Sequence, residues 1–355
     1  MTQWTSVGFA RRALPPTVAA ACLLSVVAAA RSHVTHQASA PASHATATQL
    51  GRVDLDPGGA GDSVTQVEMR NVDFVVDPDI ILRIHRLRGT MRSKTGGPVL
   101  FDDRRSFILH MNSAEVGLTG SDLTALLNKY VFAYPGAPLK HLRVNVGRSE
   151  IVQTGELHKA VDLPFTIHAT LSVTPDGHIR IHPTRTDMMG LHVDGLMHGL
   201  GLSLSTLIDL KKAKGASVIG NDIYLSPDSI LPPPTIEGHV TAVRIDGDEV
   251  VQTFGGGQDS ASVSPPLRLP DSSAPNFMFY RGGSVRFGKL LMLDTEMQIV
   301  DLDPADAFRF DLSHYNAQLI AGYSRTLPDL GLEVYMRDID KVATSRTVAV
   351  DPRRP

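Results

Sequence analysis

Apolar and polar residues alternate with a period of two along most of this chain between residues 72 and 254. The clearest example runs from Pro164 to Val173, and the turn signal Asp176-Gly177 follows it. This period is typical of antiparallel strands with one buried and one solvated face, and Asp-Gly is a strong hairpin signal. We expect Gly89 to end the second strand. The predicted strands cover residues 72–77, 81–88, 106–118, 139–146, 151–157, 164–173, 178–182, 221–225, 240–245 and 249–254.

Two stretches have helical spacing instead. The first begins at Thr119 or Ser121, either of which can cap a helix, and ends at Pro135-Gly136. The second, Met188 to Lys212, carries an apolar stripe at steps of three and four residues. Each interior glycine in this stretch disfavours a helix by about 1 kcal/mol. We therefore expect the helix to need a packing partner along its apolar face.

Beyond a Gly-, Ser-, Pro- and Asp-rich loop, short apolar stretches at 277–281, 283–287, 290–293 and 297–300 predict a β-meander. Residues 305–323 contain an amphipathic helix, and residues 332–336 form a last predicted strand. The helix presents Leu312, Tyr315, Leu319 and Ile320 on its apolar side. The elements together predict an α+β fold. In it a long curved antiparallel β-sheet wraps around one long amphipathic helix, with an additional C-terminal β-meander and helix.

The first thirty residues have the pattern of a signal peptide. Arg11-Arg12 precede an apolar run, Val18 to Ala30, that is shorter than the roughly 20 residues a membrane-spanning helix needs. Ala28 and Ala30 have the spacing of a cleavage site. We interpret Cys22, the only cysteine, as part of this signal rather than as a lipidation site. The sequence predicts export to the periplasm or the medium without disulfides, or membrane tethering if the N-terminus stays uncleaved.

The predicted organisation follows from these elements. We expect a signal peptide (1–30), a disordered linker (31–66), a β-rich domain (67–255), a loop (256–275), a C-terminal meander plus helix packed on the same domain (276–340) and a tail (341–355). The formal net charge of −3 is too small for a protein that neutralises nucleic-acid phosphates. A Gly-x-Ser-x-Gly elbow, a phosphate-binding loop, a dinucleotide fingerprint and a His-Glu-x-x-His motif are missing. We therefore predict neither catalytic residues nor a cofactor, and favour a non-enzymatic role.

Two clusters hold potential metal ligands: His168, His178 and His182 in one, and Asp301, Asp303 and Asp306 in the other. The histidines can share one face of a sheet, as zinc or copper would require, but Arg180 lies between two of them and disfavours a cation. The aspartates suit calcium, but the glycine and glutamate of an EF-hand loop are missing. Capping of the following helix by Asp306 is favoured, so we predict no metal site.

The stretch Leu118 to Asn128 contains Thr119, Asp122, Leu123 and the run Leu126-Leu127-Asn128. It resembles a helix of the bacterial periplasmic phospholipid-binding proteins of the tubular lipid-binding (TULIP-like) type. The order of elements over about residues 105–255 looks similar too, whereas residues 276–340 have no counterpart. The resemblance implies a highly curved sheet around a long helix, a groove between them for lipid acyl chains, and no catalytic set.

From the residues alone, the Met- and Leu-rich face of the long helix is either ordinary core or the lining of a lipid cavity. With the resemblance, we expect an exported, non-catalytic protein that binds or shuttles an apolar ligand such as phospholipid, and that makes peripheral membrane contact. One alternative is a structural or assembly protein of the cell envelope that contacts partner proteins through sheet edges. Another is a hydrolase with an unrecognised site. The candidate ligand-binding residues are Leu126, Phe165, Ile167, Leu171, Met197, Leu200, Leu204 and Leu207.

Overall fold

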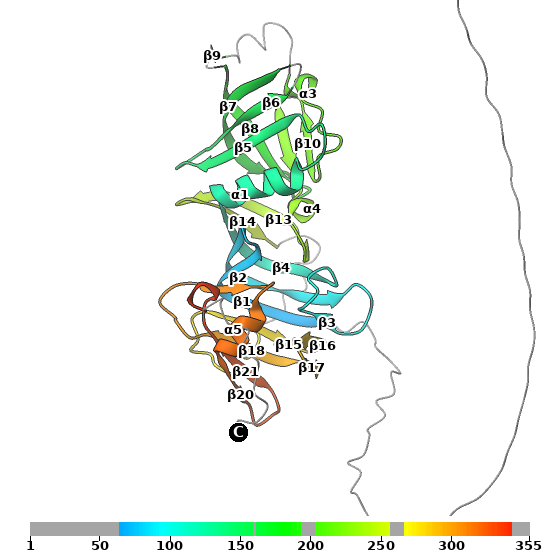
Figure 1. The fold of residues 1–355 in the computed structure, drawn as a ribbon, viewed down its shortest axis with the longest axis vertical. Helices are drawn as coiled ribbons and strands as arrows, with labels where there is room; N and C mark the ends of the chain where they lie inside the picture. The colour runs from blue at the N-terminus through cyan, green and yellow to red at the C-terminus, as the bar shows by residue number, and fades with distance from the viewer. Residues whose placement is uncertain (1–63, 159–160, 190, 193–202, 256–265, 343–355) are drawn as a thin grey trace, which may run out of the picture. The chain divides into compact units, whose positions relative to one another are not determined.

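The structure is a computed structural model that describes residues 64–158, 161–189, 191–192, 203–255 and 266–342 (Figure 1). All of them belong to one compact unit of the chain, Pro57–Pro355. The expected signal peptide and nearly all of the expected linker lie outside the described residues. The predicted linker extends too far toward the C-terminus, because its last residues, Thr65 and Gln66, already belong to a strand and pair with Met91 and Thr90.

Eleven strands form the largest sheet. Its path runs β13-β14-β4-β2-β1-β15-β18-β21-β20, with β12 beside β4 and β19 beside β1. The pairs β1–β19, β4–β12 and β18–β21 are parallel, and the others are antiparallel. Because β15 and β19 pair with β1, the C-terminal strands β15, β18, β19, β20 and β21 extend the same sheet that residues 65–119 begin. The strands are β1 (Thr65–Asp77), β2 (Ile80–Ser93), β4 (Phe107–Thr119), β12 (Thr235–Glu237), β13 (Val240–Asp246), β14 (Glu249–Phe254), β15 (Phe277–Arg281), β18 (Glu296–Asp301), β19 (Phe308–Asp311), β20 (Tyr323–Thr326) and β21 (Leu332–Met336).

Strand β2 continues through Gly89, so the predicted strand end at this glycine was wrong. The register of β2 against β4 shifts between Arg88 and Gly89. A Cβ atom at Gly89 would lie 2.0 Å from the carbonyl oxygen of His110 on β4. Glycine is therefore required because the two backbones approach closely at an irregularity in the pairing.

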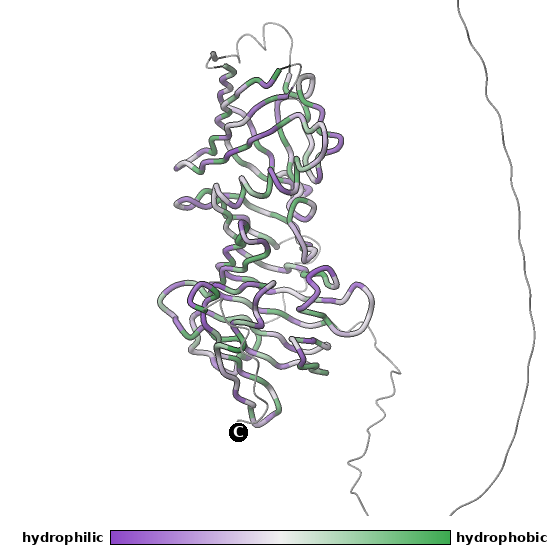
Figure 2. The backbone as a smooth tube through the Cα atoms, in the orientation of Figure 1, coloured by the Kyte–Doolittle hydropathy of each residue, from purple (hydrophilic) through white to green (hydrophobic). Residues whose placement is uncertain are grey.

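Seven strands form a second sheet, wholly antiparallel, that curls into a half-barrel. Its path runs β10-β11-β8-β7-β6-β5, with β9 beside β8. Hydrophobic and hydrophilic residues alternate along its strands (Figure 2), and the apolar side chains form a core on one face. The predicted hairpin at Asp176-Gly177 is confirmed, with Gly177 at a φ of +82°. The strands are β5 (Leu139–Val146), β6 (Ile151–His158), β7 (Asp162–Val173), β8 (Ile179–Met188), β9 (Leu191–His192), β10 (Ala216–Ile219) and β11 (Asp222–Leu225).

Short helices and a small third sheet complete the described part. The helix predicted to begin at Thr119 or Ser121 is confirmed, with Thr119 as the N-cap: α1 passes directly into the π-helical turn η1, which ends at Val131, before the predicted end at Pro135-Gly136. Strands β17, β16 and β3 form the third sheet. The bounds are α1 (Gly120–Leu126), η1 (Leu127–Val131), α3 (Leu204–Leu207), α4 (Pro227–Ile230), α5 (Tyr315–Ala321), η3 (Ile339–Lys341), β3 (Val99–Leu100), β16 (Ser284–Phe287) and β17 (Leu290–Leu293).

The prediction of a long helix over Met188 to Lys212 was wrong at both ends of this stretch. Met188 is the last residue of β8 and pairs with Phe165, and β9 follows at Leu191. At the other end, the helix α3 is only four residues long, and Ile208 after it is extended. Backbone pairing with β7 outweighs the weak helical propensity of this glycine-containing stretch. Residues 193–202 lie outside the described residues.

The C-terminal segment differs from a simple meander. Strands β15 and β18 join the large sheet, whereas the hairpin β16–β17 between them pairs with β3 instead. The predicted helix over residues 305–323 is confirmed only as α5, because β19 precedes it and β20 follows it. Ile320, expected on the apolar side, is exposed. Strand β19 is held by β1, a partner far away in the sequence that local periodicity does not reveal.

Candidate functional site

The curled seven-stranded sheet encloses two adjoining apolar cavities, of about 50 Å³ and about 20 Å³. They share a wall formed by Leu139, Gln153, Leu204, Ile208 and Ile223. Apart from Gln153 and Thr186, all the side chains that line the two cavities are apolar. Helix α1 and the turn η1 close the larger cavity on one side through three leucines: Leu123, Leu126 and Leu127.

The structure brings four of the predicted ligand-binding residues to these cavities. Leu126 lines the larger one, Phe165 and Ile167 line the smaller one, and Leu204 lines both. Leu171 packs half-buried against the same core but lines neither cavity.

The other three predicted positions are not placed at the cavities. Met197 and Leu200 lie outside the described residues. Leu207 is the last residue of α3, and its side chain lies outside what the structure describes.

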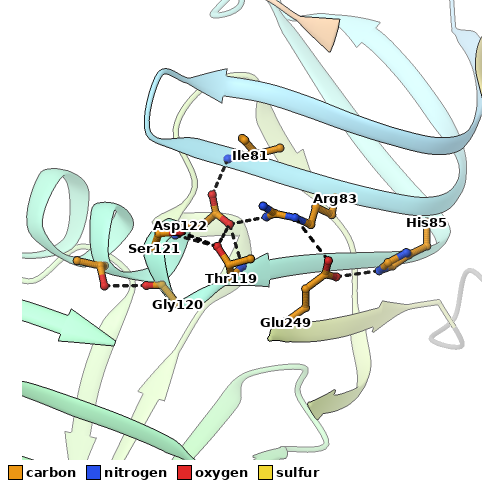
Figure 3. Close-up of polar contacts among 9 residues, drawn as sticks. Ile81, Arg83, His85, Thr119, Gly120, Ser121, Asp122 and Glu249 are labelled. Atoms are coloured by element: carbon orange, nitrogen blue, oxygen red, sulfur yellow. Dashed lines mark hydrogen bonds and ion pairs between the residues drawn. The ribbon is translucent and has the colours of Figure 1, made fainter. Parts of the chain in front are cut away.

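A buried carboxylate fixes the start of α1. Asp122 is 3% exposed and accepts hydrogen bonds from the backbone N–H groups of Thr119, at 2.8 Å, and Ile81, at 2.9 Å. The Thr119 hydroxyl accepts in return from the Asp122 N–H, which completes a capping box (Figure 3). Arg83 on β2 donates to the same carboxylate at 2.6 Å. These bonds attach the helix that closes the larger cavity to the large sheet.

The ionic network continues across the sheet from Arg83. Its guanidinium also lies 3.5 Å from Glu249 of β14, and Glu249 contacts the ring of His85 at 3.0 Å (Figure 3). Gly117 makes room for this carboxylate, because a Cβ atom there would lie 1.9 Å from it. On the other side Asp73 of β1 pairs in register with Arg83, and burial raises the pKa of Asp73. We interpret the network as an anchor for α1, because its members bond mainly to one another.

Two polar side chains of the helical segment bind the free edge of β5. Asn128 donates to the Leu142 carbonyl oxygen at 2.7 Å and accepts from the Leu142 N–H at 3.1 Å. Thr124 accepts from the N–H of Val144 at 2.8 Å. Strand β5 is the last strand on its side of the sheet, so these bonds replace a missing neighbour strand. The polar positions of the sequence Thr119 to Asn128 hold the helix, and its leucines face the cavity.

Gln153 lines both cavities but was not among the ligand-binding residues predicted from the sequence. It lies on β6 among the inward-facing positions Ile151, Gly155 and Leu157, and it is only 7% exposed. A polar residue at an inward position of an alternating strand was the available signal. Gly155 on the same face leaves space for the side chains of Leu142 and Phe165, which would lie within about 3 Å of a Cβ atom there.

The three histidines weighed as metal ligands bond to different carboxylates. His168 contacts Glu150 at 2.8 Å, and His178 contacts Asp176 at 2.7 Å. The ring of His182 lies 2.6 Å from Asp222. Separate partners hold the three rings, so they do not form a common set of ligands.

The three aspartates considered as calcium ligands do not lie together in one cluster. Asp303 and Asp306 lie with Asp338 around the ammonium of Lys341, which forms ion pairs with all three. The lysine therefore provides the positive charge that a cation would bring. Asp301 instead accepts a hydrogen bond from Asn276 at 2.9 Å, and burial raises its pKa to about 6. Asp306 does not cap the next helix as predicted, because β19 follows it.

Comparison with known proteins gives no relative: no family model, curated protein or solved structure matches the chain. Within the described ranges, the structure has no helix that is long and apolar enough to cross a membrane.

Proposed function

We propose that this chain is an exported, non-catalytic protein that binds or shuttles an apolar ligand, such as a phospholipid, inside the curled seven-stranded sheet. The observation that carries the proposal is the pair of adjoining cavities, lined almost entirely by apolar side chains, on the concave side of the sheet. Burying an acyl chain there is favourable by about 0.8 kcal/mol for each methylene group. The resemblance of residues 105–255 to tubular lipid-binding proteins supports the same function.

In this proposal α1 and η1 take the place expected for a long helix along the sheet. The cavities are small beside a typical ligand pocket of roughly 300–1,000 Å³, so a lipid must displace side chains on entry. Leu204 and Ile208 are the side chains to displace, because both line the two cavities and neither belongs to a sheet. Their segment is held to the β10–β11 turn by two bonds, from the Leu204 N–H to Asn221 and from the Ser205 N–H to the Gly220 carbonyl.

Native mass spectrometry of the purified protein, followed by organic extraction, tests the proposal. We expect a lipid adduct in stoichiometric amount. Filling the larger cavity with Ala216→Phe should abolish the adduct, at an overpacking cost of about 1–3 kcal/mol in stability. The control is Ile219→Phe on the same strand β10, where the side chain is exposed. A folded protein that carries no lipid and takes up none when lipid is added would refute the proposal.

A second candidate function, assembly in the cell envelope through protein contacts, is favoured by one surface feature. The edge strand β17 exposes Leu290, Leu291 and Leu293 to between 44% and 59%. An unpaired apolar edge is a template for another chain. Under this alternative, replacing Leu291 and Leu293 with glutamate releases a co-purifying protein and leaves lipid content unchanged.

A further inference from the structure

The side chain of Gln153 is a polar group enclosed in an apolar site. It projects from β6 between Val144 of β5 and Ile167 of β7, and it lines both cavities. The residue is only 7% exposed, and none of the side-chain hydrogen bonds in the described part of the chain involves its amide, which is open to the two cavities. A buried amide without a partner destabilises a fold, and an apolar residue of similar size would be more favourable there.

Water does not provide a good partner for this amide. A cavity of about 50 Å³ has space for a water molecule, but buried waters are typically held by about three hydrogen bonds. Among the lining side chains, a water molecule would find only the amide of Gln153 in the larger cavity and one additional polar group, the Thr186 hydroxyl, in the smaller one. The amide is therefore suited to a partner that brings its own apolar surface to the walls.

We propose that Gln153 hydrogen-bonds a carbonyl oxygen of an acyl chain, and that the ligands of this cavity are acyl lipids rather than plain hydrocarbons. The inference rests on the proposed function and narrows its ligand class. The NH2 group of the amide donates to the oxygen of a carboxyl or ester group, and the leucines and isoleucines of the walls contact the methylene groups. The carbonyl can belong to a free fatty acid or to a glycerolipid ester.

Direct binding of three probes of equal chain length tests this role: hexadecane, palmitic acid and dipalmitoyl phosphatidylglycerol. We expect the protein to bind at least one of the carbonyl-bearing probes about tenfold more tightly than hexadecane, since one good hydrogen bond is worth about that factor. Tight binding of palmitic acid alone identifies free acids as the ligands, and tight binding of the phospholipid identifies esters. The variant Gln153→Leu should bind hexadecane as before and lose the preference.

The matched control is Gln252→Leu on β14. Gln252 is equally buried, at 6% exposure, but lines neither cavity, so its replacement should leave the preference intact. A second readout is stability without ligand: Gln153→Leu should raise the urea midpoint of unfolding, because it removes an unpaired amide.

The outcomes separate the two proposals. If the protein binds none of the three probes, the proposed function itself fails. If it binds them and Gln153→Leu keeps the preference for carbonyl oxygens, the role of Gln153 is wrong while lipid binding stands. A lowered urea midpoint in Gln153→Leu would also overturn the inference, because the amide would then have a structural partner.

Discussion

Asn128 binds both backbone polar groups of Leu142, at 2.7 Å to its carbonyl oxygen and 3.1 Å from its N–H. One amide side chain from the helical segment thus pairs with the edge of β5 as a neighbouring strand would. The contact explains how a helix with a π-turn stays against an open sheet edge. It also connects stability with the proposed function, because the same segment presents Leu126 and Leu127 to the larger cavity.

Replacing this side chain should loosen the edge of the sheet. We expect Asn128→Ala to lower the free energy of unfolding by about 1–3 kcal/mol, because Leu142 loses both partners. Hydrogen exchange should show faster exchange of the Leu142 amide. Asn145→Ala, on the exposed end of the same strand, is the control and should change neither quantity. Unchanged protection of Leu142 in Asn128→Ala would contradict the assigned role.

The second prediction concerns the carboxylate that caps α1. Asp122→Ala should destabilise the fold by about 3 kcal/mol, because it leaves two backbone N–H groups without their acceptor and removes one of the two carboxylates that Arg83 pairs with. Urea unfolding measures the loss. Asp248→Ala, an exposed aspartate in the β13–β14 turn, should have little effect. Equal stability of the two variants would show that the capping box and its arginine contribute nothing.

The close approach of β2 and β4 makes Gly89 sensitive to any side chain. Gly89→Ala should cost about 3 kcal/mol, because its methyl group would have to displace the backbone at the His110 carbonyl. Thermal unfolding with Thr90→Ala as the neighbouring control measures this cost. A fully stable Gly89→Ala would mean that the two strands separate here without penalty.

Asp301 should give the fold a pH dependence. Burial raises its pKa from 3.8 to about 6, which the hydrogen bond from Asn276 only partly offsets. Because the folded pKa exceeds the unfolded one, the protonated group stabilises the fold below about pH 4 and loses this contribution as the pH rises through 6.

The variant Asp301→Asn cannot ionise, so its stability relative to the original protein should increase between pH 4 and pH 7.5, by on the order of 1 kcal/mol. Urea unfolding of both proteins across this range measures the difference. A difference that stays constant with pH would show that Asp301 has the same affinity for protons in both states.

The sequence alone determined the features that depend on neighbours along the chain. The alternation in 164–173 determined β7, the Asp176-Gly177 pair determined the hairpin after it, and the capping signals at Thr119 and Ser121 located the start of α1 to within two residues. These predictions succeed because side-chain period, turn conformation and helix capping are local properties of the chain.

Tertiary structure decided what depends on distant partners. Met188 is in a strand because Phe165 pairs with it, and β15 joins the large sheet because β1 is its neighbour. The long-helix prediction failed for this reason: a stripe of apolar residues does not reveal which backbone offers hydrogen bonds. The position of Gln153 in the cavity likewise required the curl of the sheet, which places one face of β6 opposite α3 and α1. Local patterns specify strands and caps, whereas pairing between segments far apart in sequence specifies the sheet and its cavity.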